Sequence, residues 1–161
     1  MVRKGKYIYD WPRPMVTVDA TVFAFWADKA KILLIKRGNE PFKGKWALPG
    51  GFVEIDEELG DAVARELAEE TGLVGVPLQQ MHTFGRCGRD PRGRLITIVF
   101  MGIAQPGQTR LKAGDDAAHA RWFDITKLPR NLAFDHDEVV KFAIARFKML
   151  ATKERRHRGT K

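Results

Sequence analysis

Three glutamates, Glu66, Glu69 and Glu70, are spaced so that a helix would bring their carboxylates close together. The segment 58–71 carries apolar residues at helical spacing: Leu59, Ala62, Val63 and Leu67. Glu66 and Glu70 fall on this apolar stripe. The alternative interpretation, a solvated acidic face, fits poorly because the neighbouring residues on the stripe are apolar. Carboxylates near a core need a cationic partner. Because Mg2+ takes oxygen ligands and is commonly held by one or two carboxylates plus substrate phosphates, the spacing predicts a metal site for phosphate chemistry.

The residues around these glutamates extend the pattern over 23 positions. Gly72 can take the left-handed conformation that ends a helix, and Arg65 can hold a carboxylate through a bidentate ion pair. The fixed positions are Gly51, Glu57, Arg65, Glu66, Leu67, Glu69, Glu70, Gly72 and Leu73. They match every fixed position of the Nudix box. The chain therefore resembles the Nudix hydrolases, a family that cleaves a nucleoside diphosphate linked to another group.

The resemblance implies roles for the residues of the box. Glu66, Glu69 and Glu70 would be the metal ligands, helped by the backbone carbonyl of Gly51. Arg65 would orient the glutamates through an ion pair, with Glu57 as its neighbour or as an outer ligand; a purely structural salt bridge is the alternative. The catalytic set is thus Glu66, Glu69, Arg65 and Glu57. The implied cofactor is Mg2+, with Mn2+ as a substitute, which would act as a Lewis acid and activate water.

The general base is not settled by the box. Glu66 or Glu69 could act directly. The loop 112–116 ends in Asp115 and Asp116, either of which could supply a carboxylate from across the cleft, although exposed turn residues are the simpler interpretation.

A second polar segment, 85–94, carries four arginines: Arg86, Arg89, Arg92 and Arg94. Guanidinium groups bind phosphate bidentately, so we expect substrate contacts here; a solvated hairpin loop is the alternative. This segment, with 9–14 and 132–136, resembles ADP-ribose pyrophosphatases within the family. The proline that many of those enzymes carry beyond the box has only loose counterparts, Pro77 and Pro91, which leaves the substrate open. The predicted substrate-binding set is the four arginines, Asp116 and Phe134.

Aromatic and histidine residues add weaker candidates. Trp11, Trp26 and Phe134 are candidates for stacking on a purine, whereas burial in strand-like runs explains Trp46, Trp122, Phe23 and Phe25. The histidines lack zinc-type spacing. His136, near the start of a predicted helix, could contact substrate, but a capping or core role is the simpler interpretation.

The remaining pattern indicates a sheet with helices on both sides. Apolar and β-branched runs predict strands over 15–26, 31–36, 46–48, 79–84, 95–104 and 121–123. Helical spacing predicts helices over 58–71 and 135–150, and residues 49–51 are expected to form a glycine turn. Periodicity does not give the topology. The resemblance implies the Nudix α/β/α sandwich with a mixed β-sheet over about residues 14 to 150.

The 161 residues predict one Nudix domain, 1–161, and 152–161 are expected to be a flexible basic tail. That tail carries about half of the net charge of +8, so binding to nucleic acid is not favoured. No run of about 20 apolar residues predicts a membrane span. The single cysteine, Cys87, excludes an intrachain disulfide and favours a reducing compartment, so a cytoplasmic location is expected. A homodimer is compatible with the subgroup and is not decided by the sequence.

Together these features predict Mg2+-dependent hydrolysis of a nucleoside diphosphate linked to another group. The substrate favoured by the resemblance is ADP-ribose, giving AMP and ribose 5-phosphate. A hydrolase for (d)NTPs or dinucleoside polyphosphates is the alternative with the same metal site. An ADP-ribose-sensing regulator without catalysis and an RNA-processing enzyme that uses the basic tail are alternatives of other kinds.

Overall fold

The computed structural model describes residues 9–111 and 120–158, with side chains described as far as residue 152. Its centre is a mixed sheet in the order β3-β2-β1-β6-β5, with β4 paired to β1 and β7 paired to β2. The strands are β1 (Met15–Trp26), β2 (Lys29–Lys36), β3 (Trp46–Ala47), β4 (Gly50–Phe52), β5 (Leu78–Phe84), β6 (Leu95–Ile103) and β7 (Ala120–Asp124). Only the pairing of β1 with β6 is parallel among the strand pairs of the described residues.

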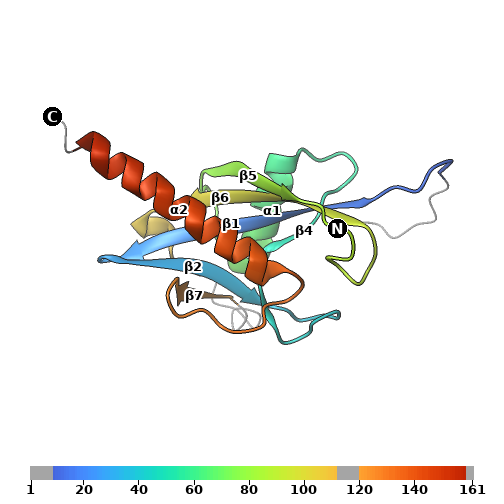
Figure 1. The fold of residues 1–161 in the computed structure, drawn as a ribbon, viewed down its shortest axis with the longest axis horizontal. Coiled ribbons are helices and arrows are strands. Elements are labelled where there is room, and N and C mark those ends of the chain that lie inside the picture. Colours follow the sequence, from blue (N-terminus) through green and yellow to red (C-terminus); the bar gives the residue numbers. More distant parts are fainter. Residues whose placement is uncertain (1–8, 112–119, 159–161) are drawn as a thin grey trace.

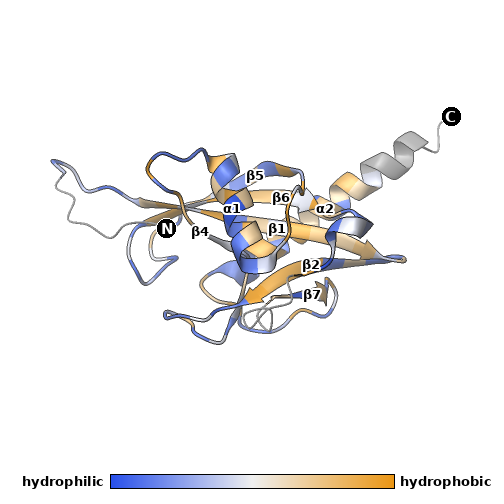
Figure 2. Cartoon of the chain, turned by 180° about the vertical axis from the view of Figure 1, so that it is seen from behind, coloured by the Kyte–Doolittle hydropathy of each residue, from blue (hydrophilic) through white to orange (hydrophobic). Residues whose placement is uncertain are grey.

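The two helices lie on opposite faces of this sheet. α2 (His136–Arg158) crosses the face seen in Figure 1, and α1 (Leu59–Thr71) covers the face seen in Figure 2. A short 3-10 turn, η1 (Pro106–Gln108), follows β6. This arrangement is the α/β/α sandwich that the resemblance implied, and it confirms the predicted fold class.

The alternation of side chains along β1 creates two cores. Even-numbered residues such as Val18 and Val22 pack against α1, together with Ala62, Val63 and Leu67. On the opposite face Phe23 packs against α2, together with Val139, Ala143 and Phe147. Because both faces are covered, the strand is an almost continuous buried run. The odd-numbered positions also include Asp19, so one carboxylate is carried into the layer between the sheet and the start of α2.

Two predicted boundaries were wrong. Gly50 and Gly51 belong to strand β4 rather than to a turn, since Gly50 pairs with Asp19 and Gly51 with Val18 across β1. A Cβ atom at Gly50 would collide with the carbonyl oxygen of Val18, so the close pairing requires glycine. The second helix was predicted to end at residue 150, whereas α2 continues to Arg158. The reason is that lysine, arginine and glutamate are good helix formers, and no glycine interrupts them before Gly159.

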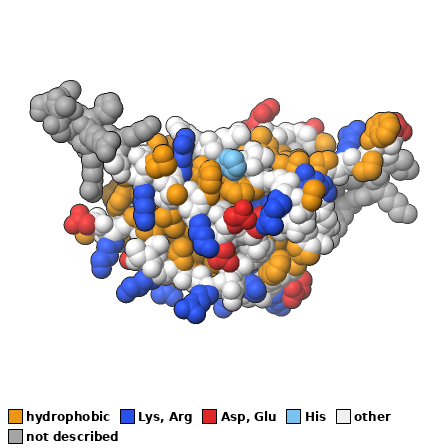
Figure 3. All heavy atoms as spheres, viewed as in Figure 1, with side chains coloured by type: hydrophobic (Ala, Val, Ile, Leu, Met, Phe, Trp, Pro, Cys, Tyr) orange, Lys and Arg blue, Asp and Glu red, His pale blue; other side chains and the backbone are white. Residues whose placement is uncertain are grey.

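Basic side chains are dispersed over the face of the molecule that α2 crosses. On the face crossed by α2, lysine and arginine side chains are spread among apolar and neutral ones without forming a single stripe (Figure 3). None of the described helices has the length and apolarity that crossing a membrane would require.

Candidate active site

Helix α1 presents its glutamates to strand β4. Ala62, Val63 and Leu67 are buried against the sheet, so the neighbouring Glu66 and Glu70 face the backbone of Gly50 and Gly51. The Gly50 N–H donates to Oε2 of Glu70 over 2.9 Å. A Cβ atom at Gly51 would collide with the Glu66 carboxylate, so a larger residue here would displace that carboxylate from its place beside β4.

The ionised form of Glu70 is only partly compensated by its surroundings. Burial raises the pKa of its carboxyl to about 8, with Glu66 and Asp19 adding repulsion, while the Gly50 N–H and Arg37 oppose the rise. Three carboxyl groups therefore influence one another across β4. Such a set of hard oxygen donors with excess negative charge suits a divalent cation such as Mg2+.

Arg65 connects the helix to the preceding loop. Its Nε donates to Oε1 of Glu57 over 2.7 Å and its Nη2 to Oε2 over 2.9 Å, which is the bidentate pair expected from the resemblance. Nη1 donates to Oε1 of Glu66 over 2.7 Å, and Nη2 reaches the carbonyl of Phe52 over 3.2 Å. The hydrogen bonds from Arg65 lower the pKa of Glu57. Arg65 thus fixes the position of the Glu66 carboxylate relative to β4.

The three predicted ligands do not converge in the structure. Among the described residues no group of three His, Cys, Asp or Glu side chains is arranged to hold a metal ion. Glu66 is held by Arg65 and Glu70 by Gly50, whereas the Glu69 side chain is 60% exposed, with Oε2 3.5 Å from Arg65. Glu66 and Glu69 both approach Nη1 of Arg65, whereas Glu70 accepts from the Gly50 N–H. The ligand roles of Glu66, Glu69 and Glu70 stay a prediction.

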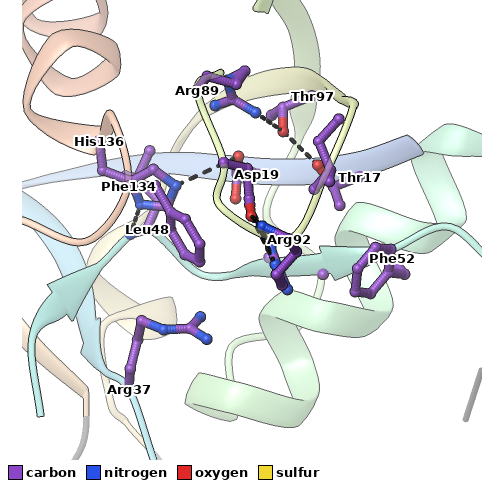
Figure 4. A pocket seen from close by; sticks show the side chains of 14 residues that line it. Thr17, Asp19, Arg37, Leu48, Phe52, Arg89, Arg92, Thr97, Phe134 and His136 are labelled. Atoms are coloured by element: carbon purple, nitrogen blue, oxygen red, sulfur yellow. Dashed lines mark hydrogen bonds and ion pairs between the residues drawn. The ribbon is translucent and has the colours of Figure 1, made fainter. Parts of the chain in front are cut away.

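A pocket opens on the other side of β4 (Figure 4). It is lined by backbone and side chains from β1, β4, the 85–94 segment and the start of α2. The lining residues are Thr17, Asp19, Arg37, Leu48, Gly50, Gly51, Phe52, Arg89, Asp90, Arg92, Leu95, Thr97, Phe134 and His136. Since Gly50 and Gly51 border both this pocket and the glutamates of α1, the two features form one site.

Two guanidinium groups flank an aromatic ring in this pocket. The Cζ of Arg37 lies 4.7 Å from the ring centroid of Phe134, and the Cζ of Arg92 lies 4.9 Å from the same centroid and 5.1 Å from that of Phe52. Asp90 holds Arg92 through Nη2 to Oδ2 at 2.7 Å. Burial and the like charge of Arg92 lower the pKa of Arg37. Two guanidinium groups, which are suited to binding phosphate, thus lie close together in the pocket.

Asp19 and His136 lie at the base of the pocket. The Leu48 N–H donates to Nδ1 of His136 over 2.9 Å, and Nε2 of His136 lies 3.8 Å from Oδ2 of Asp19. Burial raises the pKa of Asp19 to about 7, with Arg89 opposing the rise and Asp135 adding to it. Burial lowers the pKa of His136 to about 4, so the imidazole is neutral near pH 7.

The structure separates the four predicted arginines. Arg92 and Arg89 line the pocket, but Arg89 is committed to Asp135 through two bonds of 2.7 and 2.9 Å and is buried. Arg86 is exposed and pairs with Glu138, and Arg94 donates to the carbonyl of Gly85. Arg86 and Arg94 are not among the residues that line this pocket, and their contact with substrate stays a prediction.

Of the other predicted site residues, some line the pocket and others do not. Phe134 lines the pocket, as expected for a substrate contact. Trp11 is 80% exposed and Trp26 packs against Trp122, and neither is among the pocket residues. Asp115 and Asp116 lie outside the described residues.

Sequence reasoning missed Arg37 and Asp19, and it placed the substrate contact of His136 behind a capping or core role. A lone carboxylate inside the apolar run 15–26 was a usable signal for Asp19, since a buried acid needs a reason. Arg37 follows the strand predicted over 31–36, and nothing in its sequence surroundings indicated a role in a site. His136 was interpreted as a core residue, and it is indeed 5% exposed, but it borders the pocket.

Comparison with known proteins agrees with the fold and the box. A model of the NUDIX domain matches residues 15–142. The chain belongs to the Nudix family and is a Nudix hydrolase. Nudix hydrolases typically use divalent metal ions.

The chain is 48% identical over 128 residues to the ADP-ribose pyrophosphatase of Methanocaldococcus jannaschii, covering 80% of this chain and 72% of that protein. It is 36% identical over 142 residues to the ADPR responsive transcriptional repressor NtrR of Acinetobacter baylyi, covering 85% of this chain but only 56% of the repressor. A cocrystal structure of the NUDIX domain of Shewanella oneidensis NrtR complexed with ADP ribose superposes with a TM-score of 0.75 at 32% identity, covering 86% of this chain and 94% of that one.

Proposed function

We propose that this Nudix hydrolase cleaves the diphosphate of ADP-ribose to give AMP and ribose 5-phosphate. The observation that carries the proposal is the arrangement around β4. On one side lie the carboxylates of Glu66 and Glu70, and on the other a pocket with the guanidinium groups of Arg37 and Arg92. Similarity to an ADP-ribose pyrophosphatase and to a domain crystallised with ADP ribose supports the choice of substrate.

Mg2+, or Mn2+ in its place, would be held by Glu66 and Glu70, with the Gly51 carbonyl and Glu69 as further ligands. The donor set supports this assignment, because Glu70 is largely desolvated and is close enough to Glu66 and Asp19 to feel their charges. A bound divalent ion would supply charge neutralisation at the phosphoryl oxygens and a more acidic water.

The protein's own residues position these groups. Arg65 and Glu57 hold Glu66 in place, and Arg37 and Arg92 would bind the diphosphate beside it. Phe134 would offer its ring edge and hold both guanidinium groups in the pocket. The general base remains one of Glu66, Glu69, Asp115 or Asp116. We also propose that residues 1–161 form a single domain, which the one sheet and its two covering helices support.

A substrate panel tests the proposal directly. The panel holds ADP-ribose, NADH, (d)NTPs, UDP-sugars and diadenosine polyphosphates with Mg2+, and the products are separated by chromatography. We expect AMP and ribose 5-phosphate from ADP-ribose at a kcat/KM well above that of every other compound. A preference for a nucleoside triphosphate would contradict the substrate and leave the metal site standing.

Binding of ADP-ribose without turnover would instead favour a regulatory role. The similarity to the transcriptional repressor of Acinetobacter baylyi makes this the second candidate. The panel separates the two when it is combined with calorimetric titration of ADP-ribose in the presence of Mg2+.

Substituting Arg37 should weaken substrate binding. Arg37→Met keeps the length of the side chain but removes the guanidinium group, and a hydrogen bond to a charged group contributes about 1.5–3 kcal/mol. We expect KM for ADP-ribose to rise about 10- to 100-fold, which is that free energy at tenfold per 1.4 kcal/mol. Lys36→Met is the matched control, because the adjacent Lys36 is exposed and does not line the pocket. An unchanged KM in Arg37→Met would remove Arg37 from the site.

A further inference from the structure

The base of the pocket contains a polar pair that the diphosphate chemistry does not use. Asp19 is 7% exposed and His136 is 5% exposed, yet both line the pocket. Asp19 comes from the middle of β1 and His136 from the first residue of α2, so the two elements on opposite sides of the pocket each contribute one group (Figure 4).

The hydrogen bond from Leu48 fixes the proton of the imidazole. Because the Leu48 N–H donates to Nδ1, this nitrogen must carry a lone pair, and the proton of the neutral ring is on Nε2. Within the described residues Nε2 donates no hydrogen bond, and the nearest acceptor given by the structure is Oδ2 of Asp19 at 3.8 Å, beyond hydrogen-bonding distance. A buried donor and a buried acceptor thus face the same small space.

A hydroxyl group satisfies both atoms at once. Its oxygen can accept the proton of Nε2 while its own proton is donated to the Asp19 carboxylate. Two atoms 3.8 Å apart can each lie about 2.8 Å from a third, which is the normal distance for such bonds. We propose that Asp19 and His136 recognise a hydroxyl of the sugar attached to the diphosphate. This inference depends on the proposed function for the identity of that sugar.

The same pair disfavours a further phosphate. A phosphate group offers acceptor oxygens and negative charge, so it would leave the Asp19 carboxylate facing a like charge in a desolvated pocket. Arg37 and Arg92 attract phosphate next to Phe134, whereas the ionised form of Asp19 repels it at the base. The pocket therefore selects a diphosphate that ends in a polyhydroxylated sugar over a nucleoside triphosphate.

The test uses binding, so that it does not depend on hydrolysis. Ribose 5-phosphate is compared with tetrahydrofurfuryl phosphate, which has the same ring and phosphate but no ring hydroxyls, by calorimetric titration of the full chain with Mg2+. We expect the wild type to prefer ribose 5-phosphate at least about tenfold, as expected for a hydroxyl bonded to a charged group. Equal affinities would overturn the inference.

Three variants assign the preference to the pair. His136→Asn keeps an acceptor near Nδ1 for the Leu48 N–H and loses the donor at Nε2, and Asp19→Asn removes the charge without changing volume. Both should bring the two affinities together, and Asp19→Asn should raise kcat/KM for ATP relative to ADP-ribose. His136→Gln places an amide N–H near the position of Nε2 and should restore part of the preference. His82→Asn, on β5 and away from the pocket, is the control and should keep the full preference.

The outcomes separate this inference from the proposed function. A wild type that prefers ribose 5-phosphate but does not hydrolyse ADP-ribose would refute the function and leave the hydroxyl site intact. Hydrolysis of ADP-ribose with equal affinity for ribose 5-phosphate and tetrahydrofurfuryl phosphate would support the function and refute the hydroxyl site. Variants that bind ribose 5-phosphate and tetrahydrofurfuryl phosphate more weakly by the same factor would show a purely structural role for Asp19 and His136 and would overturn the inference. The ratio of the two affinities detects this outcome even if one variant is less stable.

Discussion

Glu70→Gln should abolish Mg2+-dependent turnover while leaving the protein folded. The substitution preserves shape, and the amide oxygen can still accept from the Gly50 N–H. It removes the negative charge that a divalent ion would need. Loss of an outer partner of a metal ligand already costs about 10- to 100-fold in activity, so we expect a loss of kcat of at least about 100-fold for a ligand itself. Steady-state kinetics over a range of Mg2+ concentrations measures it.

In the absence of metal, Glu70→Gln should remove part of the pH dependence of the free energy of unfolding. The folded pKa of Glu70 is about 8, above its ordinary value of 4.5. The folded state therefore holds a proton that the unfolded state releases, and stability falls as the pH rises from 4.5 towards 8. Asp19 also makes stability fall as the pH rises, between pH 3.8 and about 7. His136 makes stability increase as the pH rises, between about pH 4 and 6.5. From pH 7 to 8 Glu70 therefore makes the largest contribution to the pH dependence, and Asp19 adds a smaller one of the same sign.

Denaturant unfolding in EDTA at pH 7 and pH 8 provides the measurement. We expect the wild type to lose stability across this interval and Glu70→Gln to lose much less. Added Mg2+ should stabilise the wild type and not the variant, because a ligand that binds only the folded state shifts unfolding by mass action. Asp61→Asn, exposed on the same helix, is the control and should behave as the wild type in both assays. Full activity of Glu70→Gln would refute the metal-site assignment.

Arg89→Leu should cause the largest loss of stability among the arginines of the 85–94 segment. Arg89 and Asp135 are 4% and 9% exposed and form a bidentate pair, and Arg89 also donates to Thr97 over 2.7 Å. Removing one partner leaves the Asp135 carboxylate buried without compensation, which costs about 3–5 kcal/mol. For a chain of this length that free energy lowers Tm by about 6–20 °C, at about 2–4 °C per kcal/mol.

Arg86→Leu is the matched control for this prediction. Arg86 pairs with Glu138 in the same way, but the two side chains are 67% and 60% exposed. An exposed ion pair contributes about 0–1 kcal/mol, so Tm should change little. Thermal unfolding of the two variants gives the comparison. Equal effects would show that the burial of the Arg89–Asp135 pair does not decide its contribution.

The helix and its glutamates were predictable because their information is local. Positions 59–71 repeat at helical spacing and end at Gly72, whose φ of 77° is the left-handed conformation expected there. The Arg65–Glu57 pair was reachable by resemblance because both residues belong to one continuous motif. The strands β1, β2, β5 and β6 were likewise recognisable from short apolar runs, to within two residues at each end.

The pocket was decided by tertiary structure. Arg37, Arg92 and Phe134 are separated widely along the chain and meet only because β2, the 85–94 segment and the approach to α2 converge. Four arginines in one segment look alike in sequence, yet a buried Asp135 takes Arg89 and an exposed Glu138 takes Arg86. Likewise, an acid in an apolar strand and a histidine 117 positions later became a pair only when α2 covered β1. Local spacing specifies which groups a helix presents, whereas the partner that each charge finds depends on packing between distant segments.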